Sequence, residues 1–371
     1  MKIAVPKELK NHEYRVGLVP GAVRELVLAG HQVMVETEAG LGIGYNDQHY
    51  RDVGAQVIKN VDQLYNDAEL IIKVKEPLAA ERQQLHTGHI LFTYLHLAAD
   101  ATLTQSLVDS GATCIAYETV SNSRNELPLL APMSEVAGRM SIQAGAFCLE
   151  KSHGGAGVLL AGVAGTRPGK VVVIGAGVVG INATQIAAGL GARVVVLDRS
   201  IERLRILDHL FPSRVETLFS TTDAIESQVL DADLVIGAVL VSGARAPCLV
   251  DENMVKNMRP GSAIVDVAID QGGCVETSEP TSHDAPTFIK HGIVHYGVTN
   301  MPGAVAKTSS YALNHATLPY IQQLADKGLK QALSENTGLR DGLNIYQGKV
   351  TQPAVAKLFN QPYLDASQLF N

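Results

Sequence analysis

Three glycines at fixed spacing form the clearest chemical signal in the sequence. Gly175, Gly177 and Gly180 follow the β-branched run KVVVI and precede the apolar stretch INATQIAAGLGA. A glycine turn between a strand and a helix permits a tight bend, lets backbone approach a phosphate and aims the positive end of the helix dipole at it. The motif therefore predicts a binding site for the pyrophosphate of a dinucleotide.

A carboxylate in the next β-branched run indicates which dinucleotide is bound. Asp198 ends the run RVVVLD, where a carboxylate can accept hydrogen bonds from the adenosine ribose hydroxyls. This favours NAD over NADP. The neighbouring Arg199 leaves the exclusion of a 2′-phosphate open, and Asp198 could instead cap a helix predicted over 200–207.

Cationic residues occupy the corresponding place in the first half of the chain. Lys7, Lys10 and Arg15 follow the run KIAV, where the second half has its glycines. Arginine presents a planar fork that can take both oxygens of a carboxylate, whereas lysine acts as a point charge. The first half is therefore predicted to bind a small anionic substrate rather than a dinucleotide.

Three further polar residues end apolar runs. Lys75 ends IIKVK, His96 ends HILFTYLH, and Asp270 follows the apolar run AIVDVAI. At the carboxyl ends of strands, such side chains would face a ligand. The alternatives are a solvated lysine, a helix-capping histidine and a structural carboxylate.

The elements that position these residues recur in the same order in both halves. Each is a short β-branched run, and apolar-periodic stretches that read as helices lie between them. Strand and helix alternation predicts two Rossmann-like, doubly wound α/β domains with mostly parallel sheets flanking a cleft, although any two α/β domains would share this rhythm. The matched segments are 2–5 with 170–173, 30–37 with 191–198, and 67–74 with 231–238.

The domain boundaries follow from the same pattern. After residue 306 the apolar spacing is helical, with no new strand, turn and helix unit, so this tail should pack back onto the first half. We expect a substrate-binding domain over 1–128 and 307–371, and a dinucleotide-binding domain over 129–306.

Composition excludes several classes of function. A formal net charge of -7 leaves no basic surface for nucleic acid. The N-terminal segment lacks a signal-peptide pattern, and polar residues interrupt the apolar stretch 171–192, which indicates a cytoplasmic protein without a membrane span. The cysteines are widely separated, which predicts reduced thiols and no metal site. They are Cys114, Cys148, Cys248 and Cys274.

Along essentially its whole length, the sequence closely resembles the alanine dehydrogenase family. The resemblance is carried, in order, by KELKNHEYRVGLVP, IIKVKEP, TYLHLAAD, APMSEVAGRMS, VVVIGAGVVG, VDVAIDQGGCVET and HYGVTNMPGAVAKTSSYAL. Nicotinamide nucleotide transhydrogenases share part of this pattern. The segment 162–169 and the pair Ala306-Lys307 depart from the family's usual forms, which affects linker stiffness more than chemistry.

The resemblance implies a reaction and a set of roles. It implies reversible oxidative deamination of L-alanine to pyruvate and ammonium with NAD, by a homohexamer. Arg15 and Lys75 would hold the substrate carboxylate, while His96 and Asp270 would transfer protons. The implied cofactor contacts are Ser134, Gly175, Gly177, Val178, Val179, Gly180, Asp198, Arg203, Ser220, Val239, Leu240, Val267, Ala268, Ile269, Asp270, Val298, Asn300 and Met301.

Two other functions would share part of this pattern. One is the nucleotide-binding subunit of a transhydrogenase, and the other is a non-catalytic NAD-sensing module. A sensing module would keep the glycine turn but would have no use for a convergent cationic site. The joint presence of Arg15, Lys75, His96 and Asp270 favours the dehydrogenase.

Overall fold

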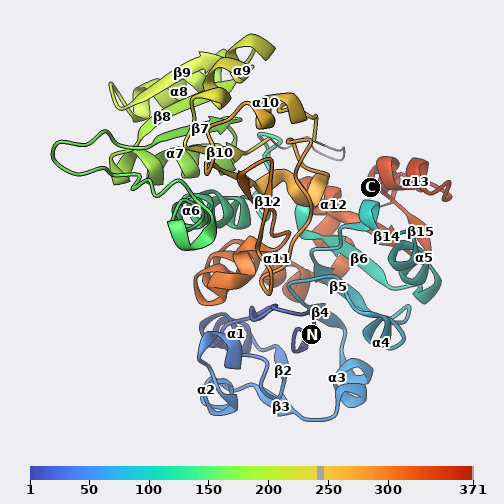
Figure 1. Cartoon of the computed structure of the whole chain (residues 1–371). Helices are drawn as coiled ribbons and strands as arrows, with labels where there is room; N and C mark the ends of the chain where they lie inside the picture. Colours follow the sequence, from blue (N-terminus) through green and yellow to red (C-terminus); the bar gives the residue numbers. More distant parts are fainter. Residues whose placement is uncertain (240–245, 370–371) are drawn as a thin grey trace. The chain divides into compact units, whose positions relative to one another are not determined.

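The computed structural model describes residues 1–239 and 246–369, and the chain divides into two compact units. One unit comprises Met1–Met133 and Gly303–Asn371, and the other comprises Ser134–Pro302 (Figure 1). The boundaries expected from the sequence, 128/129 and 306/307, differ from these by a few residues. The first observed boundary falls inside a helix, α6 (Ala131–Cys148), where the apolar pattern is continuous.

The described residues of the first unit form an eight-stranded sheet of order β15-β14-β6-β5-β4-β1-β2-β3. The strands from β6 to β3 pair in parallel, and β14 and β15 pair antiparallel. Apolar residues of the central strands are buried on both faces, as expected of a sheet covered by helices. The strands are β1 (Lys2–Val5), β2 (Gln32–Glu36), β3 (Gln56–Ile58), β4 (Leu70–Ile72), β5 (Ile90–Thr93), β6 (Thr113–Ala116), β14 (Leu343–Tyr346) and β15 (Lys349–Val350).

Side chains at the helix ends explain where several helices of this unit begin. Pro20 opens α1 at a position where its missing N–H is not needed. The side chains of Asn60 and Asp100 accept backbone hydrogen bonds at the starts of α3 and α5. The helices are α1 (Pro20–Leu28), α2 (Asp47–Arg51), α3 (Val61–Asp67), α4 (Ala79–Arg82), α5 (Ala101–Ser110), α11 (Ala306–Glu335), α12 (Thr337–Asp341) and α13 (Pro353–Leu358).

The C-terminal tail differs from its predicted all-helical form. The long helix α11 is present, with a break at Gly328, but β14 and β15 follow it and extend the sheet of the first unit. Their turn places Gln347 and Gly348 at positive φ, the geometry of a two-residue hairpin turn. The strands are too short to show a period of two, and Gln-Gly is a weaker turn signal than Asn-Gly, so the sequence pattern missed them.

The second unit contains a seven-stranded sheet of order β12-β13-β11-β10-β7-β8-β9, with only β12 antiparallel among the described strands. The strands are β7 (Lys170–Ile174), β8 (Arg193–Asp198), β9 (Val215–Phe219), β10 (Leu234–Gly237), β11 (Ala263–Asp266), β12 (Thr287–Lys290) and β13 (Ile293–Tyr296). The helices are α7 (Val178–Leu190), α8 (Ile201–Leu210), α9 (Thr222–Leu230) and α10 (Glu252–Lys256), besides α6.

The two sheets have the same order over their parallel strands, and this confirms the predicted pair of doubly wound α/β folds. The matched sequence segments correspond to β1 with β7, β2 with β8, and β4 with β10. In each sheet the direction of winding reverses beside the first strand, between β1 and β4 or between β7 and β10. Ligands of such folds bind outside the carboxyl ends of the strands at this switch point, which is where the candidate residues lie.

Within the described ranges, no helix is long and apolar enough to span a membrane. The same residues contain no group of three or more histidine, cysteine or acidic side chains arranged to hold a metal ion. The cysteines carry free thiols; Cys248 is exposed and the other three are buried.

Candidate functional site

The glycine turn between β7 and α7 has the geometry that a phosphate-binding turn requires. Gly175 has φ of 106°, and a Cβ there would lie 2.6 Å from the carbonyl oxygen of Ala238, at the end of the neighbouring strand β10. A Cβ on Gly180 would meet the carbonyl oxygen of Gly175, so the helix packs directly on the turn. A Cβ on Gly177 would meet nothing within 4 Å. The turn therefore leaves open space at Gly177, beside the amino terminus of α7.

Asp198 joins this turn to the end of β8. Its Oδ2 accepts a hydrogen bond from the Ala176 N–H at 2.6 Å, and its Oδ1 accepts one from the Ser200 N–H at 2.7 Å. The cap of α8 is Ser200, whose hydroxyl accepts from the Arg203 N–H, so Asp198 is not the helix cap considered as an alternative. The Arg203 guanidinium lies 3.8 Å from Asp198 Oδ2. The carboxylate thus stands beside the glycine turn with an arginine next to it.

Most of the other cofactor residues implied by the resemblance follow the ends of neighbouring strands in this unit. Ser220 follows β9, and its N–H donates to the Asp198 carbonyl oxygen at 3.1 Å. Val239 follows β10, and its backbone nitrogen would lie 3.2 Å from a Cβ on Gly175. Leu240 lies outside the described residues. Val178 and Val179 open α7.

Ser134 lies near the start of α6 and is the first residue of the second unit. This helix is tied to α7 by a hydrogen bond of 2.9 Å from Arg139 Nε to Asn182 Oδ1. The Asn182 side chain in turn donates to the Val178 carbonyl oxygen at 2.9 Å. The start of α7 is therefore fixed from the α6 side.

A buried carboxylate organises the turn after β11. Asp266 accepts hydrogen bonds from the N–H groups of Ala268, Cys274 and Val275 at 3.0–3.1 Å. Burial raises the pKa of Asp266 even though these hydrogen bonds lower it. The resulting 3₁₀ helix, Val267–Gln271, contains the exposed Asp270, which therefore lies on a turn rather than at the strand end predicted from the sequence.

Three implied contacts follow β13. Val298 is buried, and the Asn300 carbonyl oxygen lies 2.8 Å from His283 Nε2. Met301 is buried and begins a short 3₁₀ helix. These residues continue the edge formed by the carboxyl ends of the strands.

In the first unit, the cationic residues come together after the adjacent parallel strands β1, β4 and β5. The electrostatic neighbours of Lys75 are Glu76, Arg15, Glu13 and Lys10. Because the carboxyl ends of parallel strands share one edge of the sheet, residues far apart in sequence meet there. Lys7 does not join this set, contrary to expectation, and forms an exposed ion pair with Glu38 at 3.0 Å.

Arg15 is buried and held by a carboxylate. Its Nε and Nη2 donate to Glu13 at 2.6 and 2.5 Å, and its Nη1 lies 3.1 Å from Met133 Sδ. Burial lowers the pKa of Arg15, but the Glu13 hydrogen bonds and charge raise it further, so the net shift is upward. Glu13 therefore takes the Nε and Nη2 edge of the guanidinium group.

Lys75 is half-buried rather than solvated, and its backbone is fixed by a second carboxylate. Glu8 Oε1 accepts from the N–H groups of Val74 and Lys75 at 2.6 and 3.4 Å, just beyond the end of β4. Burial lowers the pKa of the Lys75 ammonium, Glu76 opposes this shift, and Arg15 adds to it. An incoming anion would oppose this lowering, because it stabilises the charged form of the ammonium.

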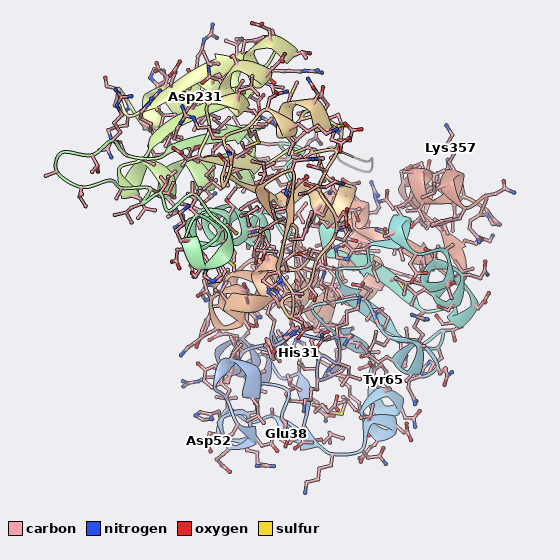
Figure 2. The ribbon with its side chains drawn as sticks, viewed as in Figure 1. His31, Glu38, Asp52, Tyr65, Asp231 and Lys357 are labelled. Atoms are coloured by element: carbon pink, nitrogen blue, oxygen red, sulfur yellow. The ribbon has the colours of Figure 1, made fainter. Side chains whose placement is uncertain are left out.

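Glu8 is itself part of a buried ionic chain. The Lys73 ammonium lies 3.4 Å from Glu8 Oε2 and 2.7 Å from Glu81 Oε1. Tyr65, labelled in Figure 2, donates its hydroxyl to Glu81 Oε1 at 3.2 Å. These buried ion pairs anchor the loop after β1 to the segment after β4, from which the side chain of Lys75 extends.

His96 has an unusual backbone conformation, with φ of 50° and ψ of 38°. Glu118 stabilises it by accepting the N–H groups of Leu95 and His96 at 3.1 and 2.6 Å. The residue stands at the cap position of a short 3₁₀ helix (Leu97–Ala99), but its side chain makes no capping hydrogen bond, which rules out the capping role considered as an alternative. Its Nδ1 instead lies 3.4 Å from Glu76 Oε2.

The acidic partners Glu8, Glu13, Glu76 and Glu118 were not predicted. Two of them had a weak signal, because Glu76 directly follows Lys75 and Glu13 lies two residues before Arg15. Glu8 and Glu118 reach their partners only through the pairing of strands distant in sequence. The signal that points to Glu8 and Glu118 is their place after strands adjacent to β4 and β5, which only the order of the sheet shows.

Two family models and several curated proteins match this chain. Residues 4–137 match the family model "Alanine dehydrogenase/PNT, N-terminal domain", and residues 141–353 match its C-terminal counterpart. The chain is 57% identical to the alanine dehydrogenase of Halomonas elongata, with 100% of both chains covered. It is 55% identical to that of Bacillus subtilis, with 99% of this chain and 97% of the relative covered.

Solved structures give the same result. A structure of L-alanine dehydrogenase superposes with a TM-score of 0.93 at 54% identity, covering 97% of this chain and 99% of that chain. A transhydrogenase from Sinorhizobium meliloti superposes with a TM-score of 0.80 at 24% identity, covering 95% and 100%, which shows the fold alone. The chain belongs to the alanine dehydrogenase/PNT family.

Proposed function

We propose that this chain is an NAD-dependent L-alanine dehydrogenase, which converts L-alanine to pyruvate and ammonium and runs the reverse reductive amination. The observation that carries the proposal is the gathering of Arg15, Lys75 and His96 after three adjacent parallel strands, in a chain that also has the glycine turn. Full-length relatives named alanine dehydrogenase, 50–57% identical, support it.

The cations of the first unit orient the substrate. Arg15 and Lys75 attract the carboxylate, and fixing it restricts the rotation of the α-carbon, so the reacting groups meet in one geometry. Glu13 forms an ion pair with the Arg15 guanidinium. Glu8 accepts a hydrogen bond from the backbone beside Lys75. The site is therefore organised before the substrate arrives, which lowers the entropy lost on binding.

Proton transfer is the proposed role of His96. The substrate amine must lose a proton before the α-carbon can give up a hydride, and the unprotonated nitrogen of a neutral imidazole can accept it. We assign Asp270 to orienting the water that adds to the resulting imine and to stabilising its positive charge. The exposed position of Asp270 on its turn is compatible with contact with water.

The second unit has the features that an NAD site needs. The open space at Gly177 fits the pyrophosphate, the N–H groups at the start of α7 would meet its charge, and Asp198 would meet the adenosine ribose. When bound, NAD supplies the acceptor for the hydride of the α-carbon. The remaining implied contacts follow the ends of the neighbouring strands of the same sheet.

We also propose that the enzyme is a homohexamer in the cytoplasm. The resemblance stated above supports the hexamer. The free thiols accord with a reducing compartment.

The decisive experiment is an NADH-oxidation assay with ammonium and a panel of small 2-oxo acids. We expect turnover with pyruvate, little with larger oxo acids, and none when ammonium is omitted. A transhydrogenase subunit would need a second nucleotide as acceptor, and a sensing module would bind NADH without turnover. Either of those results would refute the proposal.

A further inference from the structure

Glu76 stands between a lysine and the imidazole of His96. It follows β4, and His96 follows the adjacent parallel strand β5. Glu76 Oε1 pairs with the ammonium of Lys10, while its Oε2 lies 3.4 Å from His96 Nδ1. Among the residues that the structure describes, neither Oε2 nor Nδ1 forms a hydrogen bond, and both atoms are buried. These two atoms are therefore each other's polar neighbours.

The charge of Glu76 is fixed by its surroundings. Burial raises the pKa of this carboxyl, but the neighbouring His96 imidazole, the charge of Lys75 and the contact with Lys10 outweigh it and hold the pKa well below its usual value. At neutral pH the group is a carboxylate, and a carboxylate can only accept hydrogen bonds.

An ionised acceptor opposite Nδ1 determines which imidazole nitrogen can act. A neutral imidazole carries one N–H, and a lone pair on Nδ1 would face the negative charge of Glu76. The proton therefore belongs on Nδ1, and the lone pair belongs on Nε2. Glu118 contacts only the backbone here, through the N–H groups of Leu95 and His96. Among the described carboxylates, Glu76 alone therefore determines which ring nitrogen of His96 carries the proton.

We propose that Glu76 is the positioning residue of His96, and that Lys10 is the residue that orients Glu76. The carboxylate accepts the Nδ1–H of the imidazole and leaves Nε2 as the atom that takes the proton of the substrate amine. This inference rests on the proposed function, in which His96 is the base, and it gives Lys10 and Glu76 a part in the same reaction.

The variant Glu76→Gln tests this assignment, because Lys10 dictates how the new amide must turn. The ammonium of Lys10 requires an acceptor, so the amide oxygen would face Lys10 and the amide NH₂ would face His96 Nδ1. Nδ1 must then accept, and the proton moves to Nε2, which can no longer act as the base. We expect kcat to fall by about 10²- to 10⁴-fold, the range for a misdirected general base, while the KM for pyruvate changes little.

A second substitution should restore part of the lost activity. In Lys10→Met/Glu76→Gln the ammonium is gone, so the amide can turn its oxygen toward Nδ1 and recover the productive tautomer. We expect kcat of the double variant to exceed that of Glu76→Gln by about tenfold or more, since the acceptor geometry returns. The matched control is Glu38→Gln, which removes a carboxylate paired with a lysine at the surface of the same unit (Figure 2) and should leave kcat unchanged.

A readout other than activity follows the lone pair directly. Diethyl pyrocarbonate acylates an unprotonated, accessible imidazole nitrogen, and peptide mass spectrometry reports the rate of labelling at His96. We expect slower labelling in Glu76→Gln than in the parent protein and recovery in the double variant. If Glu76→Gln does not fold, Glu76→Asp keeps the charge but shortens the side chain, and it should lower both kcat and the labelling rate.

The outcomes separate the two proposals. A His96→Gln variant that keeps turnover within about threefold of the parent would refute the proposed base and the function built on it. If His96→Gln is inactive but Glu76→Gln retains both kcat and the labelling rate, the positioning role is overturned and the proposed function stands. A double variant no more active than Glu76→Gln would overturn the orienting role of Lys10.

Discussion

A methyl group at Gly177 should separate cofactor binding from folding. Gly177 has φ of −77° and ψ of −166°, a backbone conformation that alanine adopts freely, and a Cβ there would meet nothing within 4 Å. Gly177→Ala should therefore fold normally. The methyl group would, however, occupy the space through which a pyrophosphate must approach the start of α7.

The size of the binding loss can be worked out from this geometry. A hydrogen bond from a backbone amide to a charged group contributes about 1.5–3 kcal/mol, so displacing the pyrophosphate from two such donors removes about 3 kcal/mol or more. Each 1.4 kcal/mol corresponds to about tenfold in affinity. We expect the NADH dissociation constant of Gly177→Ala to rise about 10²-fold, and its free energy of unfolding to change by less than about 0.5 kcal/mol.

Two other glycines of α7 provide the controls. A Cβ on Gly189 also meets open space, so Gly189→Ala should bind NADH normally and gain about 0.5–1 kcal/mol of stability. Gly180→Ala should lose both binding and stability, since its Cβ would strike the Gly175 carbonyl oxygen. NADH fluorescence titration and thermal unfolding measure the two quantities. If Gly177→Ala bound NADH within about threefold of the parent, the glycine turn would not be the pyrophosphate site.

Three further outcomes are expected. Asp198→Asn should weaken NADH binding about tenfold and reduce the preference for NADH over NADPH, because an amide accepts hydrogen bonds through one oxygen only. Titration with both cofactors measures the two affinities. Arg15→Ala should raise the pyruvate KM by about 10²-fold in steady-state assays and lower the free energy of unfolding by about 3–5 kcal/mol, because the buried Glu13 carboxylate loses its guanidinium. Burial lowers the pKa of His89 and of His295 below the ordinary 6.5. Unfolding therefore takes up protons as the pH falls through that value. Chemical denaturation between about pH 7 and 5 should show the free energy of unfolding falling by up to about 1.4 kcal/mol per pH unit for each histidine. The double variant His89→Gln/His295→Gln should show a shallower fall in the free energy of unfolding.

The strands and the glycine turn of the second unit could be predicted because their signals are local. β8 spans the run RVVVLD that was predicted to be a strand, and α7 begins at Val178, directly after Gly177. A β-branched run, a glycine turn and an apolar-periodic stretch are each specified by residues adjacent in the chain. No knowledge of distant contacts is needed to recognise them.

The strands that carry the substrate cluster end earlier than predicted. β4 and β5 end at Ile72 and Thr93, so Lys75 and His96 lie three residues beyond them. The chain must leave the sheet before it can turn across the edge of the sheet. Both apolar runs continue beyond the last paired residue because the residues that follow remain buried. Hydrophobic pattern alone does not mark where pairing stops.

The acidic partners depend on contacts that the sequence does not display. Glu118 holds the backbone of His96 from a separate strand end, and Glu8 holds that of Lys75 from the loop after β1. A lone carboxylate in a loop has no periodicity or spacing to distinguish it from a solvated one. Residue type and position could therefore suggest where Arg15 and Lys75 lie but misplaced Lys7, whereas the groups that orient the cations became evident only from the pairing of the strands.

Transfer of deuterium from substrate to cofactor tests the central claim most directly. When the protein is incubated with NAD and L-alanine deuterated at the α-carbon, mass spectrometry of the reduced cofactor should show one deuterium for each pyruvate formed. Reduced cofactor without deuterium, or no reduction at all, would contradict the account.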